Sequence, residues 1–116
     1  MTVETVTGKK LDGDLFCNYL RNLVNQLFKI LPIRESEEAS LVSYIASLQS
    51  ELIGCQRLIS VLHDDSMFLS MISILQFLID HPDSSVKVFK REVFKTISLC
   101  NKLKAKYIDL LDLKEA

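Results

Sequence analysis

Apolar residues between positions 41 and 62 recur at alternating steps of four and three, and this pattern constrains the fold more than any other feature. The residues at those steps are Leu41, Ile45, Leu48, Leu52, Cys55, Ile59 and Leu62. Such a heptad pattern places one apolar stripe along a helix and is typical of helices that cross at a shallow angle. It predicts a helix over about residues 37–63, with Ser36 as N-cap and an interior Gly54 that allows another helix to approach closely.

Three further stretches also have helical periodicity. Residues 12–31 carry pairs of apolar side chains every four positions, and Pro32 is expected to end that helix. Residues 66–80 are apolar nearly all round and follow a candidate cap at Asp64 or Asp65. Residues 85–112 follow a candidate cap at Asp83 or Ser84. The apolar seam of this last helix comprises Val86, Phe89, Val93, Ile97, Cys100, Leu103, Tyr107 and Leu110, and Phe94 broadens it.

The short connections between these stretches favour antiparallel neighbours. We therefore expect an all-α fold, a four-helix antiparallel bundle of unequal helices. Residues 12–116 would form a single domain, and residues 1–11 a flexible N-terminal tail. With 3 Gly and 2 Pro in 116 residues, turn formers are too scarce for a strand-rich domain.

The apolar content also bears on partners. It reaches 48% of the residues, and the helices at 12–31 and 66–80 carry more apolar width than one small core can cover. Surplus of this kind indicates an interface. We expect a homo-oligomer, most simply a dimer, or a larger protein partner.

The charge and cysteine content argue against several settings. The formal net charge of −1 gives no global reason to bind nucleic acid or an anionic membrane. No window approaches the roughly 18 apolar residues of a transmembrane helix, and the polar N-terminus is unlike a secretory signal. Three widely spaced cysteines are a poor disulfide framework, so we expect free thiols, a cytoplasmic location and no membrane association.

Motifs for chemistry are scarce. The glycines do not cluster into a phosphate loop, no cysteine or histidine spacing suggests zinc, and the Glu-x-x-His pattern of di-iron bundles is missing. The sequence therefore predicts no catalytic residues, no cofactor and no metal.

One pair of residues offers an alternative. Arg57 and His63 are separated by five residues, which resembles the Arg-x(4–6)-His signature of the HEPN superfamily of small helical RNases and toxins. The resemblance implies that this pair positions a scissile phosphate across a dimer and helps to transfer a proton. Arg suits phosphate geometry and His titrates near neutrality. Leu58 departs from the polar residue that commonly follows the Arg.

The helix predicted at 85–112 has the clearest charge feature. Between residues 86 and 107 its many cations accompany a single acid, Glu92. The candidate binding residues are Lys87, Lys90, Arg91, Lys95, Lys102 and Lys106. Such a face could bind an acidic protein partner or bind nucleic acid as a module without chemistry. It could also pair with the acidic residues in and beside the helix at 37–63, which are Glu35, Glu37, Glu38, Glu51, Asp64 and Asp65.

Three segments suggest a family. They are LPIRESEEASLVSY at residues 31–44, SILQFLID at 73–80 and REVFKTISLCNKL at 91–103. Together they resemble small helical proteins of Gram-positive phages and genomic islands, which implies an accessory protein of a mobile element. The leading hypothesis is a non-enzymatic interaction protein that acts as an adaptor, accessory subunit or inhibitor.

Overall fold

The computed structural model describes the backbone of residues 2–4, 10–36 and 39–115, and the side chains of residues 15–36 and 39–107. Two strands, β1 (Thr2–Glu4) and β2 (Lys10–Asp12), pair antiparallel with Val3 opposite Leu11. The other elements are α1 (Gly13–Phe28), α2 (Ile30–Glu35), α3 (Leu41–Leu58), α4 (Ser60–His63), α5 (Ser66–Asp80) and α6 (Val86–Glu115). The described chain is thus helical apart from one short hairpin, which confirms the all-α class.

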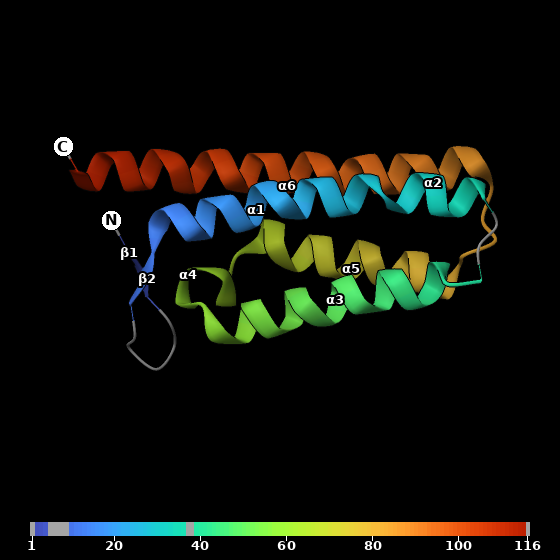
Figure 1. Ribbon diagram of the computed structural model, residues 1–116, viewed down its shortest axis with the longest axis horizontal. Helices are drawn as coiled ribbons and strands as arrows, with labels where there is room; N and C mark the ends of the chain where they lie inside the picture. The colour runs from blue at the N-terminus through green and yellow to red at the C-terminus, as the bar shows by residue number, and fades with distance from the viewer. Residues whose placement is uncertain (1, 5–9, 37–38, 116) are drawn as a thin grey trace.

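The helices form an elongated body of 47 × 25 × 20 Å. Figure 1 shows α1 and α2 following one another along α6, and α3 below them beside α5. The largest helix contacts join α1 to α6, α5 to α6 and α3 to α5. α6 thus contacts both α1 and α5, and α5 also contacts α3. The paired strands lie at the end where α1 begins (Figure 1).

The N-terminal segment differs from the tail expected over residues 1–11. Residues 2–4 and 10–11 belong to the paired strands, whereas residues 1 and 5–9 lie outside the described part.

Pro32 interrupts the first helix without ending it, so that prediction is wrong. A proline cannot donate a hydrogen bond to the carbonyl four residues earlier, which here belongs to Phe28. The helix is accordingly divided at Lys29, although this residue keeps right-handed helical angles (φ −66°, ψ −18°). Pro32 lies in the first turn of α2, where helices tolerate proline, and the chain stays helical to Glu35.

The helix predicted over 37–63 is also divided. Ser36 is the C-cap of α2, not an N-cap, and α3 starts after Ser40; residues 37 and 38 lie outside the described part. Ile59 adopts an extended conformation (φ −101°, ψ 118°) between α3 and α4. The expected close approach at Gly54 is wrong, because a Cβ built there would meet no atom within 4 Å.

The last two helices follow their predicted bounds more closely. Asp65 caps α5 by accepting a hydrogen bond of 3.0 Å from the Phe68 N–H, and α5 spans the predicted residues. Ser85 caps α6, because its Oγ accepts from the Val88 N–H at 3.3 Å. The candidates Asp83 and Ser84 were therefore one or two residues too early.

The predicted apolar seams form the core. Nearly all of their members are buried, including Leu52, Leu62, Phe89 and Cys100. On α6 the exceptions are Val86, which is 54% exposed, and Phe94, which is 48% exposed. On α3, Cys55 is half-buried, and on α1, Phe28 is 44% exposed. The Leu110 side chain lies outside the described part.

Candidate binding groove between α5 and α6

An open groove of about 610 Å³ runs along the junction of α5 and α6. Its lining residues are Leu69, Ser70, Ser73 and Ile74 from α5, and Lys95, Ser98, Leu99 and Lys102 from α6. The core side of α5, with Phe68, Met71 and Leu75, is fully buried. The groove therefore lies on the outer edge of a well-packed helix pair.

Small side chains explain why this junction is open. Ser70 and Ser73 on α5 and Ser98 on α6 are exposed and line the groove. A longer side chain at any of these positions would cover the boundary between the two helices. The remaining floor is apolar, because Ile74 and Leu99 are half-buried and Leu69 is 41% exposed.

Two lysines give the groove its charge. Lys95 and Lys102 are seven residues apart on α6, which places their side chains on one face about 10 Å apart along the helix axis. Among the residues that the structure describes, neither lysine has an ion-pair partner. No acidic residue lines the groove, so its local charge is positive.

The other predicted cations are distributed elsewhere. Lys90 Nζ lies 3.9 Å from Glu35 Oε1 and borders a smaller pocket of about 240 Å³ between α2 and α6. Arg91 Nε lies 3.4 Å from Oε1 of its neighbour Glu92, and Lys87 is exposed at the start of α6. The single basic row of the sequence is thus divided in the structure.

Lys106 belongs to an internal cluster. Its Nζ lies 2.8 Å from Asp65 Oδ2, and the Tyr107 hydroxyl lies 2.9 Å from the same oxygen and 3.0 Å from the Val61 carbonyl oxygen. The hydroxyl has one proton, so it donates to one of these acceptors at a time. This contact joins the start of α5 to a late turn of α6, which shows that the two helices run in opposite directions.

The environment of Asp65 favours its ionised form. Burial raises the pKa of this carboxyl, but the hydrogen bonds from Lys106, the Phe68 N–H and Tyr107 outweigh burial and hold the pKa below its ordinary value. Burial and the neighbouring Asp65 raise the pKa of Tyr107. The Lys106 charge is therefore used inside the fold. The Lys106–Asp65 and Lys90–Glu35 pairs are part of the predicted pairing between basic and acidic residues.

Arg34 is similarly engaged within the fold. Its guanidinium donates to the carbonyl oxygens of Pro82 and Ser84 and lies 4.9 Å from the centre of the Phe89 ring. These contacts fix the loop before α6 to α2.

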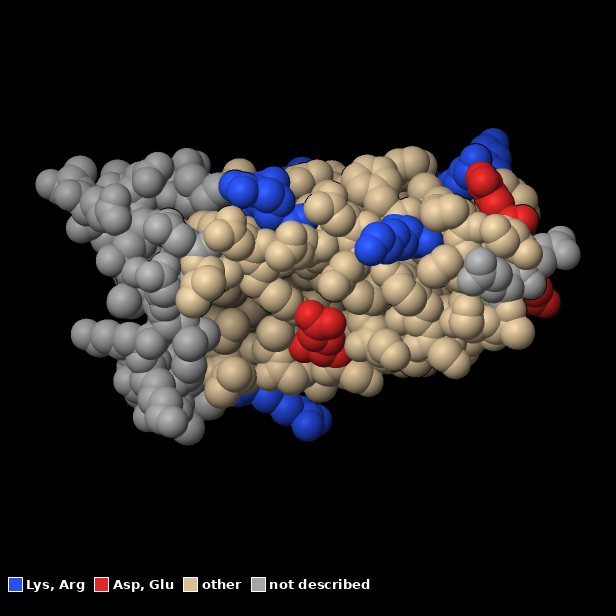
Figure 2. All heavy atoms as spheres, viewed as in Figure 1, with Lys and Arg blue, Asp and Glu red and all other residues tan. Residues whose placement is uncertain are grey.

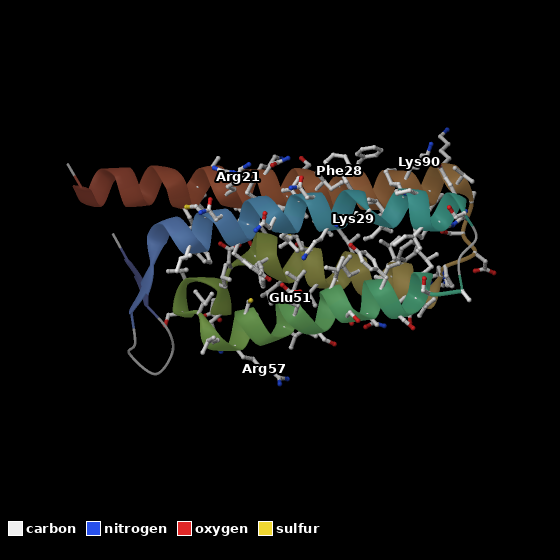
Figure 3. The ribbon with its side chains drawn as sticks, viewed as in Figure 1. Arg21, Phe28, Lys29, Glu51, Arg57 and Lys90 are labelled. Atoms are coloured by element: carbon white, nitrogen blue, oxygen red, sulfur yellow. The ribbon has the colours of Figure 1, made fainter. Side chains whose placement is uncertain are left out.

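Arg57 and His63 make no hydrogen bond or ion pair with each other in the described part of the chain. Arg57 is in the last turn of α3, and its side chain extends away from the body of the molecule (Figure 3). His63 ends α4, beyond the extended residue Ile59, and its Nδ1 lies 3.4 Å from Asp64 Oδ1. Both side chains are exposed.

The groove serines and floor residues were not among the predicted site residues. The usable signal was the spacing of Ser66, Ser70 and Ser73, at steps of four and three, which places three small polar residues on one face of an otherwise apolar helix. A face of that kind beside a lysine-bearing helix indicates an open, charged junction.

Two general properties concern the described residues only. They contain no helix long and apolar enough to cross a membrane. No three of their His, Cys, Asp and Glu side chains lie close enough together to hold a metal ion. Cys55 and Cys100 are free thiols.

Comparison of the chain with protein-family models, with curated proteins and with solved structures finds no match.

Proposed function

We propose that this protein is a non-enzymatic interaction protein, a four-helix antiparallel bundle whose α5–α6 groove docks an acidic amphipathic helix of a partner protein. The observation that carries the proposal is the pair of unpaired lysines, Lys95 and Lys102, beside an apolar floor. The free thiols of Cys55 and Cys100 support the cytoplasmic setting expected from the sequence.

The shape and chemistry of the groove favour a helical segment. An amphipathic helix buries its apolar stripe in a groove and presents polar residues along the edge of that stripe. Leu69, Ile74 and Leu99 supply the apolar contact, while carboxylates two turns apart on the partner would match the spacing of Lys95 and Lys102. The three serines offer hydroxyls to the remaining polar groups at the edge.

Nucleic acid is a weaker match for the same groove. Single-strand binders stack bases on aromatic side chains, and no aromatic residue lines this groove. Two lysines would also neutralise few phosphates. Arg57 and His63 make no hydrogen bond or ion pair with each other in the described residues, which likewise gives no geometric support to the RNase alternative.

A designed peptide tests the proposal. The probe is a fluorescein-labelled helical peptide of about 15 residues, with leucines on one stripe and glutamates seven residues apart beside it. Fluorescence anisotropy should show saturable binding that weakens with added salt, because exposed ion pairs are screened. A matched peptide with lysines in place of the glutamates should bind more weakly.

Charge reversal locates the binding site. An exposed ion pair contributes about 0.2–1 kcal/mol, so converting two attractions into repulsions in K95E/K102E should weaken binding by roughly 10-fold. The control K87E/R91E makes the same change of charge outside the groove and should retain the affinity. Equal affinity of wild type and K95E/K102E would contradict the proposal.

A second variant separates shape from charge. Ser73→Leu fills the groove while keeping both lysines, and it should weaken the acidic peptide without altering the fold measured by circular dichroism. Unimpaired binding to this variant would show that the peptide contacts the lysines outside the groove.

A further inference from the structure

A second exposed surface lies on another side of α6, where α6 meets α1 and α2. Its centre is the aromatic pair Phe28 and Phe94, whose ring centres are 6.1 Å apart with an interplanar angle of 74°. Phe28 is 44% exposed and Phe94 is 48% exposed. Two large aromatic rings in edge-to-face contact on a surface, with nearly half of each in contact with solvent, are characteristic of an interface.

The apolar surface continues toward the end of the body. Val86 is 54% exposed, and the half-buried Leu31 lies with it along the small pocket between α2 and α6. Val24, also half-buried, lies one turn before Phe28 on α1. The aromatic pair is thus part of an apolar strip contributed by both helices.

Charges of opposite sign lie at equal sequence distances from the centre of this strip. Arg21 precedes Phe28 by seven residues, and Glu35 follows it by seven, so each lies about 10 Å from Phe28 along the helix direction. Steps of seven keep all three residues on nearly the same side of the helix, and Lys29 preserves helical angles between them. Figure 3 shows Arg21, Phe28 and Lys90 in a row along the upper edge, and Glu35 pairs with Lys90.

From this arrangement we infer that the α1–α6 face is the interface of a twofold homodimer. A twofold axis through the Phe28–Phe94 pair brings Arg21 of each protomer to Glu35 of its partner and stacks the two aromatic pairs against each other. A surface with a cation and an anion equally distant from its centre is complementary to its own copy, as isologous interfaces require. A partner of a single charge would instead meet like charge at one end.

The contacts that Arg21 and Glu35 make within one protomer are compatible with new contacts between protomers. Arg21 donates to Asn18 Oδ1 at 3.3 Å on an exposed surface, a contact that costs little to replace. Glu35 lies 3.9 Å from Lys90 and is well exposed, so it has free lone pairs for a second cation. In the dimer Glu35 would lie between Lys90 of its own protomer and Arg21 of the other.

Figure 2 shows the neighbouring face of the molecule, where charged side chains are few and widely separated. On the α1–α6 strip itself, the opposite charges at Arg21 and Glu35 can fix the register of two apolar strips. The groove between α5 and α6 uses other residues of α6, so both surfaces can be occupied together.

Sedimentation equilibrium and light scattering test the dimer. The wild-type chain should dimerise, and Phe94→Asp should dissociate the dimer by at least about 100-fold, because the charge would be buried among apolar groups. Lys102→Glu, which changes the α5–α6 groove, should leave the dimer unaffected. A wild-type chain that stays monomeric at high concentration would overturn the inference.

The charge pair permits a sharper test. Arg21→Glu alone and Glu35→Arg alone should each weaken dimerisation by about 10-fold, since each places like charges opposite one another twice. An equimolar mixture of the two variants should form a heterodimer in which both contacts are again Arg to Glu. Failure of the mixture to associate more tightly than either variant alone would refute the proposed register.

Discussion

The cluster around Asp65 provides the most direct test of how this fold is held together. The carboxylate caps α5 through the Phe68 N–H at 3.0 Å and also receives Lys106 and Tyr107 from α6. Its side chain is 2% exposed, whereas that of Lys106 is 47% exposed. Asp65→Ala removes the cap and both contacts from α6. Asp65→Asn keeps a good cap through its remaining oxygen, but it replaces the charged acceptor of Lys106 and Tyr107 with an NH2 donor.

The expected magnitudes follow from these contacts. Loss of an N-cap costs about 1 kcal/mol. A hydrogen bond to a charged group contributes about 1.5–3 kcal/mol, which the exposure of Lys106 reduces to about 1 kcal/mol. Asp65→Ala should therefore lower the free energy of unfolding by about 2–3 kcal/mol, and Asp65→Asn by about 1 kcal/mol. Tyr107 can still donate to the Val61 carbonyl in both variants.

The same cluster predicts a dependence on pH. Because the pKa of Asp65 is lower in the folded protein than its ordinary value of 3.8, its ionised form stabilises the fold above about pH 4. That contribution is lost as the pH falls through the folded pKa. The difference in stability between wild type and Asp65→Asn should therefore be largest near neutral pH and shrink below pH about 4.

Urea unfolding followed by circular dichroism, at neutral and acidic pH, measures these differences. Asp64→Asn is the matched control, because the Asp64 side chain is 98% exposed and its replacement should change stability by less than about 0.5 kcal/mol. The reasoning would be refuted if Asp65→Asn matched wild type at neutral pH, or if the control were destabilised as much as Asp65→Asn.

Two further predictions concern α3 and the buried thiol of α6. Gly54→Ala should stabilise the protein by about 0.5–1 kcal/mol in thermal or urea unfolding, because a helical Cβ there meets no atom within 4 Å; a destabilised variant would show that the site is crowded. Burial raises the pKa of Cys100 to about 12, and its thiol is fully buried and 3.6 Å from the Leu20 carbonyl oxygen. Iodoacetamide at pH about 8 should therefore modify Cys100 only after unfolding, while the half-buried Cys55 reacts first; mass spectrometry that finds Cys100 modified early in the folded protein would contradict this.

Helix 66–80 illustrates what the sequence alone determines. Its start is marked by Asp65, whose short carboxylate reaches a free backbone N–H, and its end is followed by Pro82. These signals act within a few residues, so sequence reasoning locates them. The apolar seams were also predicted well, since burial of one face depends on periodicity alone.

The division between α3 and α4 could not be predicted in the same way. Leu58, Ile59 and Ser60 carry no glycine or proline, and the heptad spacing continues through them. Ile59 is extended and only 5% exposed. Its β-branched side chain tolerates this conformation, but the position of the break depends on tertiary burial, which the heptad spacing does not reveal. Pro32 was misread for the opposite reason, because its effect is local and weak at the start of a helix.

The candidate sites depend on which cations find partners. The basic residues of α6 were evident in the sequence, but their division was not. Lys106 pairs with Asp65, which is 41 residues away in sequence. Lys95 and Lys102 have no ion-pair partner among the described residues and share their groove with serines of α5. Likewise, the sequence places Phe94 beside the apolar seam of α6. Its exposure becomes evident only in the structure, where its ring meets Phe28 of α1 on the surface.

The use of separate sides of α6 has a consequence for binding strength. A twofold dimer formed through Phe28 and Phe94 would present two α5–α6 grooves, one from each protomer. A partner carrying two copies of the acidic helix would then bind its second copy at a high effective concentration, and avidity could exceed the affinity of one groove by about 10²–10⁴-fold. Monovalent and tandem peptides should therefore differ greatly in affinity for the wild-type chain and little for Phe94→Asp. Dimerisation would in this way couple weak recognition at each groove to assembly.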